Sequence, residues 1–371
     1  MPQSESKTVL LHDWLTGFRG GERVLEAFCE MAPGAPIYTL LHAPGSTSDL
    51  IEKRSIHTSF LNSIPGIENR YRKFLPLFPT AVDRMQIAEG AELVLSSCHC
   101  VIKGLRKPKG SVHVSYIHSP MRYMYDQYDH YFGPHAPLYQ RMGARVFRDY
   151  LVRWDRESNR NVDMMIANSH FVKERIRKYY ERDALVVHPF VELKDFERIQ
   201  AAKPAKGDGF VMVTAFAPNK RVDLAIEAFN ELKLPLTIVG SGQLEQELKA
   251  MAGPNIRFLG NIGREEIVDL LARSQALIFP GVEDFGITPL EALAAGTPVI
   301  ALRAGGVLET LTEEDTIFFD EPNAKSLIQA VRRLASEPRV PNFSRLKAFS
   351  RERFKNEMSA AIEDAKNGKK V

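Results

Sequence analysis

The chain has 371 residues, of which 44% are hydrophobic and 26% charged, a balance typical of a folded globular protein. This composition excludes a disordered chain, a collagen-like repeat and a small disulfide scaffold, and the length predicts two domains of about 150 residues or more. No run approaches about 18 apolar residues and the first residues lack a secretory pattern, so we expect neither a membrane-spanning helix nor export. Three cysteines, Cys29, Cys98 and Cys100, fit a reducing cytoplasmic compartment better than a disulfide framework.

The net charge of +3 is unevenly distributed along the chain. Residues 70–160 alone contain 15 basic and 8 acidic residues, a local excess of seven positive charges. Two interpretations are open: a solvated basic face, or attraction to an anionic partner such as phosphate, lipid headgroups or nucleic acid. Charge alone does not decide between them.

Short apolar runs alternate with helical patterns in the first half of the chain. Helical spacing covers Glu22–Met31, Pro137–Asn161 and Phe171–Tyr180, and Asn168-Ser169 supplies an N-cap for the last of these. Strands separated by helices predict βαβ units and a mainly parallel sheet. The strands are predicted, in order, at Lys7–Leu11, Ile37–Leu41, Leu93–Ser97, Val112–His118, Met164–Ala167 and Leu185–His188.

A polar stretch at residues 201–209 predicts a linker, after which the alternation begins again. Helices are predicted at Asp223–Glu231, Leu244–Met251 and Phe343–Ala365. The strands of this half are predicted at Phe210–Thr214, Leu236–Val239, Ile256–Leu259, Ala276–Phe279, Pro298–Ala301 and Thr316–Phe319.

These patterns predict an α/β fold with two Rossmann-like doubly wound domains facing a central cleft. The first domain is expected over residues 1–200 and the second over residues 201–342. Residues 343–371 are expected to form a helix that returns to the first domain. Ligands should bind at the carboxyl ends of the strands, in the cleft between the domains.

The most informative segment, Phe279–Leu302, reads FPGVEDFGITPLEALAAGTPVIAL. It runs from a predicted strand end through a loop into a helix that is expected to begin near Pro289. Glu283 lies in the loop and Glu291 in the first helical turn, where carboxylates can accept hydrogen bonds from sugar hydroxyls. The other interpretation is that Glu291 caps its helix and Glu283 is a surface residue. Backbone N–H groups near the helix start suit a phosphate, and they belong to Phe285, Gly286, Ile287 and Thr288.

The string EDFGITPLEALAAGTPVIA closely resembles the signature of family 4 of the retaining glycosyltransferases, which have the GT-B fold. The resemblance implies that Glu283 lies near the donor sugar and that Glu291 binds the ribose of a nucleotide sugar. It also implies that the backbone following Asp284 holds the leaving diphosphate. By the same resemblance, residues 1–200 bind the acceptor and residues 201–342 bind the donor.

Other segments of the second half match the same family in the same order. The string VTAFAPNKRVDLAIEAF implies that Lys220 contacts the donor diphosphate. Many members carry an arginine five residues earlier, where this chain has Ala215; Arg221 could compensate, or it is a surface arginine at a helix start. The turn Gly240-Ser241-Gly242 resembles the family's glycine turn beneath the nucleotide, and Ile262 ends a string that resembles the loop whose backbone meets the base.

In the first half, the loop Arg19-Gly20-Gly21-Glu22 follows the first predicted strand, and its glycines allow a backbone to approach a phosphate or sugar closely. A plain βα turn is the other interpretation. The family places a glycine-rich loop here, facing the donor diphosphate. His118 ends a predicted strand, and by resemblance it contacts the donor sugar or supports the reacting centre. A structural histidine is the alternative.

The string YIHSPMRYMYDQYDHY resembles GDP-mannose-dependent mannosyltransferases of bacterial surface-polysaccharide assembly. The segments Arg70–Met85 and Leu93–Arg106 resemble that subgroup too. Within the first string, Arg122, Tyr123 and Asp126 are expected to bind the acceptor.

The segment Arg70–Met85 interleaves basic side chains with apolar ones that include Tyr71, Phe74, Leu77 and Phe78. Such a segment suits an anionic lipid interface, and a polyprenyl-diphosphate-linked acceptor, as used by related enzymes, would explain it. A half-buried loop and helix is the alternative. We find no motif that reads nucleic acid and expect no nucleic-acid partner.

No metal site is predicted. Cys98-His99-Cys100 is too compressed for zinc, and a strand would place the two cysteines on one face with the histidine opposite. No aspartate pair for a divalent cation is evident, and GT-B enzymes generally use cationic side chains and helix dipoles instead. We therefore expect no metal and no cofactor beyond the nucleotide-sugar co-substrate.

Together these motifs predict a transfer of a hexose, with mannose from GDP-mannose favoured, to a hydroxyl of a glycan or lipid-linked glycan, with retention of configuration. A UDP-sugar donor and a non-catalytic nucleotide-sugar-binding protein stay open as alternatives. A glycan phosphorylase would need a pyridoxal lysine, for which no signature is seen, and GGER is not the fingerprint of a dehydrogenase. The expected location is the cytoplasm, with contact to the inner face of the cytoplasmic membrane.

Overall fold

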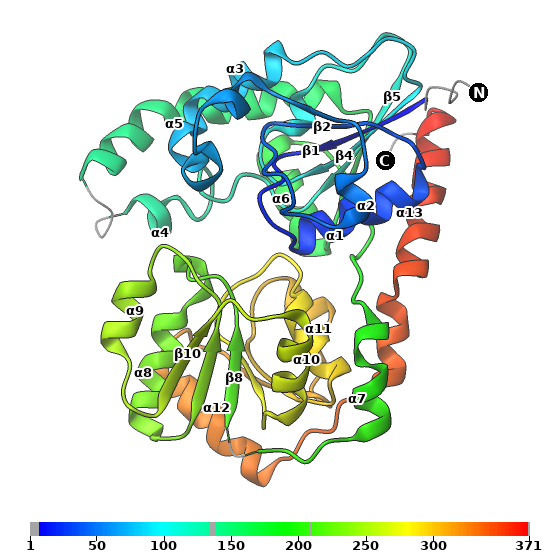
Figure 1. The fold of residues 1–371 in the computed structure, drawn as a ribbon. Coiled ribbons are helices and arrows are strands. Elements are labelled where there is room, and N and C mark those ends of the chain that lie inside the picture. The colour runs from blue at the N-terminus through cyan, green and yellow to red at the C-terminus, as the bar shows by residue number, and fades with distance from the viewer. Residues whose placement is uncertain (1–6, 134–137, 208, 370–371) are drawn as a thin grey trace. The chain divides into compact units, whose positions relative to one another are not determined.

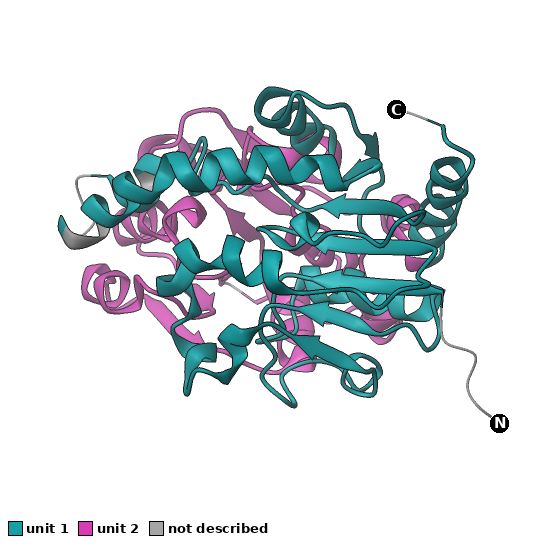
Figure 2. Cartoon of the chain, turned by 90° about the horizontal axis from the view of Figure 1, so that it is seen from above, with its two compact units in different colours: residues 1–189, 352–371 teal, residues 190–351 magenta. Residues whose placement is uncertain are grey.

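The computed structural model describes residues 7–133, 138–207 and 209–369, so the first six residues and Pro137, the expected start of a helix, lie outside the described part. The chain forms two compact units (Figure 2). The first comprises the chain up to Pro189 together with the segment from Glu352 onward, and the second runs from Phe190 to Arg351. The boundaries expected from the sequence were residues 200 and 342.

The first boundary comes before the polar stretch because the segment that precedes this stretch packs into the second unit. A 3₁₀ turn (Leu193–Phe196) and helix α7 (Glu197–Ala202) follow the boundary. Phe196 and Ile199 are buried in the same cluster as Val211 of the second sheet. Burial of these apolar side chains assigns the segment to the second unit.

The first unit is built on a parallel sheet of seven strands in the order β3-β2-β1-β4-β5-β6-β7 (Figure 1). Leu10 of β1 lies opposite Leu95 of β4 and Ile37 of β2. Six of these strands match predicted ones, and β3 was not predicted. The strands are β1 (Thr8–His12), β2 (Ile37–Thr39), β3 (Ile56–Thr58), β4 (Leu93–Cys98), β5 (Val112–Ile117), β6 (Met164–Ala167) and β7 (Leu185–Val186).

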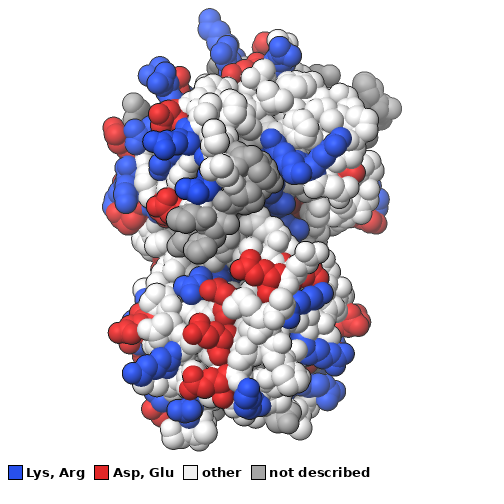
Figure 3. All heavy atoms as spheres, turned by 90° about the vertical axis from the view of Figure 1, so that its left-hand side faces the viewer, with Lys and Arg blue, Asp and Glu red and all other residues white. Residues whose placement is uncertain are grey.

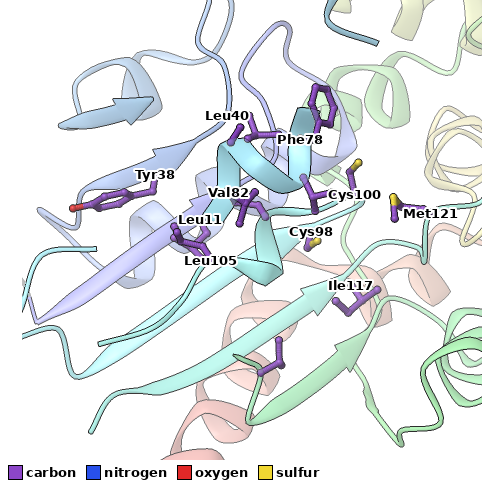
Figure 4. Packing of buried hydrophobic residues seen from close by; sticks show 14 of the residues in the cluster. Leu11, Tyr38, Leu40, Phe78, Val82, Cys98, Cys100, Leu105, Ile117 and Met121 are labelled. Carbon is purple, nitrogen blue, oxygen red and sulfur yellow. The ribbon is translucent and has the colours of Figure 1, made fainter. Parts of the chain in front are cut away.

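The helices of the first unit cover a core of buried apolar side chains, part of which Figure 4 shows. The predicted cap of α6 is confirmed, because the Ser169 hydroxyl accepts the Val172 N–H at 3.0 Å. The helices are α1 (Gly20–Met31), α2 (Asp49–Glu52), α3 (Phe78–Arg84), α4 (Tyr128–Phe132), α5 (Leu138–Ser158), α6 (His170–Tyr180) and α13 (Arg351–Lys366). Further 3₁₀ turns lie at Phe60–Ser63, Ile67–Asn69, Tyr71–Leu77, Ile102–Gly104 and Asn159–Asn161.

The prediction of a single helix over Phe343–Ala365 is wrong. A 3₁₀ segment (Phe343–Phe349) is separated from α13 by Ser350, whose backbone is extended. The 3₁₀ segment packs into the second unit, while α13 packs on α1, where the rings of Phe354 and Phe28 stack with centroids 6.1 Å apart. The break allows the two halves of this segment to bury apolar side chains in different cores.

The second unit has a parallel sheet of six strands in the order β10-β9-β8-β11-β12-β13. Val211 of β8 lies opposite both Thr237 of β9 and Leu277 of β11. The strands are β8 (Phe210–Val213), β9 (Leu236–Val239), β10 (Ile256–Gly260), β11 (Leu277–Phe279), β12 (Val299–Leu302) and β13 (Thr316–Phe319), and all six match predicted strands. Besides α7, the helices are α8 (Val222–Leu232), α9 (Glu245–Met251), α10 (Arg264–Arg273), α11 (Ile287–Ala294) and α12 (Ala324–Ser336), with 3₁₀ turns at Pro218–Lys220 and Gly306–Glu309.

In each sheet the strand order reverses beside the first strand of the unit, between β1 and β4 and between β8 and β11. The connections on the two sides of such a switch point leave in opposite directions, so a crevice opens at the carboxyl ends of the two strands. Ligands of doubly wound sheets bind there. No helix among the described residues is both long and apolar enough to cross a membrane.

The packing of α13 on α1 gives a test of the first unit. Phe354 is fully buried, whereas its neighbour Lys355 forms a surface ion pair with Glu30. Replacement of Phe354 by alanine should lower the free energy of unfolding of the first unit by about 3–5 kcal/mol, and Lys355→Ala by less than about 1 kcal/mol. Urea unfolding checks both values. Equal losses in the two variants would contradict the packing.

Candidate functional site

An ion pair between Lys220 and Glu283 lies at the switch point of the second unit. Lys220 ends the 3₁₀ turn that follows β8, and Glu283 stands four residues after the end of β11. The two side chains are 23% and 13% exposed, so both are largely shielded but accessible. The sequence had assigned both residues to the donor, and the structure brings them into direct contact.

The loop that follows β8 and the loop that follows β11 approach each other closely, and this brings Lys220 and Glu283 into contact. A side chain at Gly281 would place its Cβ 2.5 Å from the carbonyl oxygen of Asn219 and 2.9 Å from the Cα of Lys220, which only glycine avoids. On its other side, the Glu283 carbonyl accepts the N–H of Gly306 at 2.8 Å. The backbone of Glu283 is therefore fixed from both sides, and neither Gly281 nor Gly306 was recognised from the sequence.

The helix after this loop, α11, begins at Ile287, two residues before the predicted position. Gly286 is its N-cap and has the left-handed conformation, with φ of 92°. Because of this earlier start, Glu291 lies in the second turn rather than the first. Asp284 and Phe285, which come just before the cap, are buried. Thr288 lies in the first turn with Ile287, so the predicted donor-binding stretch does form a helix start.

Glu291 does not cap its helix but binds an arginine that the sequence analysis missed. Arg264, the first residue of α10, donates to Glu291 Oε1 at 2.6 Å and to Asp195 Oδ2 at 2.8 Å. Its guanidinium also lies over the ring of Phe196, 5.3 Å from the centroid. Burial opposes its charge, but the carboxylates of Glu291 and Asp195 raise the pKa of Arg264. Arg264 thus fixes the orientation of the Glu291 carboxylate.

The predicted glycine turn lies beside the loop that follows β8. A Cβ at Gly240 would meet the carbonyl oxygen of Thr214 at 1.8 Å, and one at Gly242 would meet that of Phe216 at 2.6 Å. These glycines are therefore required for the packing of the two loops. Ile262 belongs to the next connection, and Asn261, its neighbour, exchanges hydrogen bonds with the Ser241 side chain.

Arg221, which was expected to compensate for Ala215, forms an ion pair with Asp223. It follows the 3₁₀ turn with φ of 51°, and its Nε lies 3.2 Å from both carboxylate oxygens of Asp223. Ala215 itself is exposed in the loop after β8. The guanidinium of Arg221 is therefore engaged with its own helix start.

A polar cluster occupies the switch point of the first unit. The Ser97 hydroxyl, at the end of β4, lies 2.8 Å from Nε2 of His118 and 3.2 Å from Nδ1 of His12. Gly20 and Gly21, predicted as part of a loop, are the first two residues of α1. This helix start packs directly against the rings, since a Cβ at Gly21 would lie 3.4 Å from His12 and 3.8 Å from His118. The two first-unit features that were predicted to face the donor, the glycine loop and His118, are thus neighbours.

Asp13 organises this cluster, although the sequence analysis did not single it out. It is completely buried, and its carboxylate accepts four backbone N–H groups at 2.7–2.9 Å, those of residues 99–102. Burial disfavours the charge, but the neighbouring His99 and these hydrogen bonds lower the pKa of Asp13. The carboxylate therefore holds the turn that follows β4. A charged residue directly after the apolar strand β1 is the signal that could have revealed it.

Two further groups of the cluster have shifted pKa values. Burial opposes the charge of Glu22, but the nearby imidazole of His12, whose Nε2 lies 3.7 Å from Oε1, lowers the pKa of this carboxyl to about 2. Its Oε2 accepts the N–H of Arg19 at 2.9 Å. Burial and the neighbouring His99 lower the pKa of His118 to about 3. At neutral pH the cluster therefore contains a charged Glu22 and an uncharged His118.

The three residues predicted to bind the acceptor lie in the turns between β5 and α4. The Tyr123 hydroxyl lies 2.7 Å from the sulfur of Cys100, and Asp126 accepts a hydrogen bond from Arg175 at 2.6 Å. Arg122 is half-buried beside them. Tyr123 and Asp126 thus contribute to the packing of the first unit.

The segment Arg70–Met85 does not present its aromatic side chains to the surroundings. Tyr71 and Phe78 are buried in the first core, and Phe74 packs against it, so of the two interpretations the half-buried loop and helix is the one observed. Leu77, in contrast to Tyr71, Phe74 and Phe78, is exposed. Alternation of basic and apolar residues here reflects a chain folded over its own core.

The Cys98-His99-Cys100 segment is not a continuous strand, because β4 ends at Cys98. Both cysteines are buried in the first core. Within the described residues, no three histidine, cysteine, aspartate or glutamate side chains are grouped so that they could hold a metal ion.

Two Rossmann-like domains in one chain, each with a parallel sheet, have the architecture of the GT-B fold. The sucrose-phosphate synthase of Thermosynechococcus elongatus has the same fold, with a TM-score of 0.73 at 20% identity over 96% of this chain and 98% of that one. So does Alr3699/HepE of Anabaena in complex with UDP and glucose, with a TM-score of 0.66 at 15% identity over 96% and 99% of the two chains.

Comparison of sequences identifies the family. The family described as "Glycosyltransferase Family 4" matches residues 18–195, and "Glycosyl transferases group 1" matches residues 194–353. The chain belongs to glycosyltransferase family 4.

Relatives in this family include mannosyltransferases. Alpha-1,3/1,6-mannosyltransferase ALG2 of Homo sapiens is 29% identical over 47% of this chain and 50% of its own length. O-antigen chain mannosyltransferase C of Escherichia coli is 28% identical over 54% of this chain and 58% of its own length. The chain spans about half the length of the curated relatives it matches.

The low pKa of Glu22 predicts how stability depends on pH. The folded-state pKa of about 2 lies below the ordinary value of 4.5, so the stabilisation is complete above about pH 4.5 and is lost as the pH falls towards 2. The full effect is about 3 kcal/mol.

The variant Glu22→Gln should therefore show a smaller loss of unfolding free energy between pH 5 and pH 3 than the unchanged protein, measured by urea unfolding. Glu89→Gln, at an exposed position of the same unit, is the control and should leave the pH dependence almost unchanged. Identical pH profiles for Glu22→Gln and the unchanged protein would contradict the assignment.

Proposed function

We propose that the protein is a retaining glycosyltransferase that transfers mannose from GDP-mannose to a hydroxyl group of a glycan or lipid-linked glycan. The observation that carries this proposal is the ion pair of Lys220 with Glu283 at the switch point of the second unit. Mannose as the sugar is supported by the matched relatives, whose names describe mannosyltransferases. The bacterial surface-polysaccharide strings of the first half point in the same direction.

In this proposal the second unit holds the donor. Lys220 neutralises charge on the leaving diphosphate, and the N–H groups at the start of α11 add to this positive field. Glu283 accepts hydrogen bonds from the sugar hydroxyls. Glu291, oriented by Arg264, accepts those of the ribose, and the turn at Gly240-Ser241-Gly242 supports the nucleotide.

The transfer breaks the bond between the anomeric carbon and a diphosphate oxygen, and it forms a bond from the same carbon to the acceptor oxygen. The acceptor attacks on the face that the diphosphate leaves, so configuration is retained. The proton of the acceptor hydroxyl passes to an oxygen of the leaving phosphate, and no protein base is required. Because Lys220 and the helix N–H groups provide the positive field, the proposal includes no metal ion.

The first unit contributes His118 and the Gly20-Gly21 loop. With its pKa lowered to about 3 by burial and by His99, the imidazole of His118 is neutral at pH 7. It therefore positions the sugar through a hydrogen bond rather than as a cation. The hydroxyl of Ser97, 2.8 Å away, holds the ring in place.

Substitution of the ion pair tests the site. Lys220→Ala and Glu283→Ala should each lower turnover of GDP-mannose by about 10²-fold or more, because each removes a group that meets the reacting atoms. Arg333→Ala is the control; it should change turnover by less than about tenfold, since this guanidinium pairs with Glu337 on the surface of the second unit. GDP release with a lipid-linked glycan acceptor is the measurement. Full turnover by the Lys220→Ala/Glu283→Ala double variant would contradict the assignment.

The donor is tested by calorimetric titration with GDP-mannose and UDP-glucose. We expect tighter binding of GDP-mannose, and an affinity for GDP that falls about tenfold in Glu291→Gln, which loses one charged hydrogen-bond acceptor for the ribose. Preference for UDP-glucose would overturn the choice of mannose but not the family. Binding without turnover on any acceptor would favour the non-catalytic alternative.

A further inference from the structure

Helix α5 exposes a stripe of apolar side chains that no other described element covers. Leu138, Met142 and Val146 are 67%, 62% and 71% exposed, and their spacing of four residues places them along one side of the helix. Tyr150 continues this row, and Phe147 lies beside it. We call these five residues the α5 stripe. Of the twelve exposed large apolar side chains in the described part of the chain, five belong to it.

The stripe lies on the part of α5 that is not anchored in the core. The last two turns are fixed by buried Leu151 and by Asp155, which forms a buried ion pair with Lys103. Before Leu151, no described residue of the helix is buried. Figure 1 shows this N-terminal part of α5 extending beyond the sheet of the first unit.

Arginines accompany the stripe. Arg141 and Arg145 are exposed, and no ion pair links either of them to another described residue. Arg148 lies over the ring of Tyr128 at 4.2 Å, and Asp149 is the only acidic residue between Leu138 and Tyr150. Figure 3 views the molecule from this side and shows blue basic side chains bordering uncharged surface on the first unit.

A shallow pocket of about 500 Å³ lies against the beginning of the stripe. Its walls include the aromatic rings of Tyr128 and Phe132 and the side chains of Leu138 and Met142. Three arginines, Arg141, Arg145 and Arg148, and one carboxylate, Asp149, also line it, so the charged part of the lining is positive by two. Apolar walls combined with cationic side chains match an amphiphile with an anionic headgroup.

We propose that α5 docks the first unit on an anionic lipid bilayer. Leu138, Met142 and Val146 enter the interfacial layer, while Arg141 and Arg145 contact the phosphate headgroups. The chemistry favours lipid over a protein partner because the cations stand beside exposed aliphatic side chains, in the region 70–160 that has an excess of seven positive charges. This docking surface replaces the segment Arg70–Met85, whose aromatics are buried, as the membrane contact.

Vesicle co-sedimentation tests the proposal. The full chain should bind phosphatidylcholine vesicles that contain phosphatidylglycerol, and bind pure phosphatidylcholine vesicles at least tenfold more weakly. Met142→Glu/Val146→Glu should lower binding to the anionic vesicles at least tenfold, and Arg141→Gln/Arg145→Gln about tenfold. All four positions are exposed, so circular dichroism of the variants should match that of the unchanged protein.

The controls use apolar residues exposed elsewhere. Val340→Glu in the second unit and Leu77→Glu in the Arg70–Met85 segment should leave vesicle binding unchanged. Unchanged binding by Met142→Glu/Val146→Glu, or loss of binding in Leu77→Glu, would overturn the proposal. So would a change from dimer to monomer in the stripe variants without any change in vesicle binding, because the occupant would then be a second copy of the chain. The assay contains no nucleotide sugar, so its outcome is independent of the proposed transfer.

Discussion

The reversal of strand order beside the first strand of each sheet is the constraint on which both candidate sites depend. It directs neighbouring connections away from each other, so the carboxyl ends of β1 and β4, and of β8 and β11, are left uncovered by the crossover helices. Residues far apart in sequence meet there, Lys220 with Glu283 in one unit and Ser97 with His118 in the other. The shared topology explains why the two units of the chain, although they differ in sequence, place polar groups at equivalent positions of their sheets.

Two buried carboxylates near His118, those of Asp13 and Glu22, are stabilised by backbone N–H groups together with neighbouring histidines. The carboxylate of Asp13 accepts hydrogen bonds from four N–H groups. That of Glu22 accepts one, and it lies 3.7 Å from Nε2 of His12. Fixed donors of this kind cost no reorganisation when a ligand arrives. The cluster around His118 is consequently preorganised by residues that need not contact any substrate.

Local patterns in the sequence were sufficient for the strands of both sheets, except β3, whose three residues Ile56–Thr58 are half exposed or exposed and carry no apolar run. The family signature located Glu283, Glu291 and Lys220 because their order along the chain is characteristic. The contacts of Arg264 depend on loops that meet only in three dimensions, so no spacing reveals them. Asp13 has a local signal, a charge directly after an apolar strand, but its four N–H partners have none. The segment Arg70–Met85 was ambiguous in sequence because basic and apolar residues alternate in the same way at a lipid interface and in a chain that covers a core.

The discontinuity of the first unit has a consequence for folding during synthesis. The second unit is continuous from Phe190 to Arg351, so all its residues leave the ribosome before Phe354, which completes the packing on α1. The apolar surface around Phe28 in the first unit therefore stays exposed while the second unit is synthesised. A chain arranged in this way exposes apolar surface for the time needed to translate more than 160 residues, as counted from the boundary at Pro189 to the return at Glu352. The need for chaperones during translation would then depend on the first unit, although most of this unit is synthesised before the second.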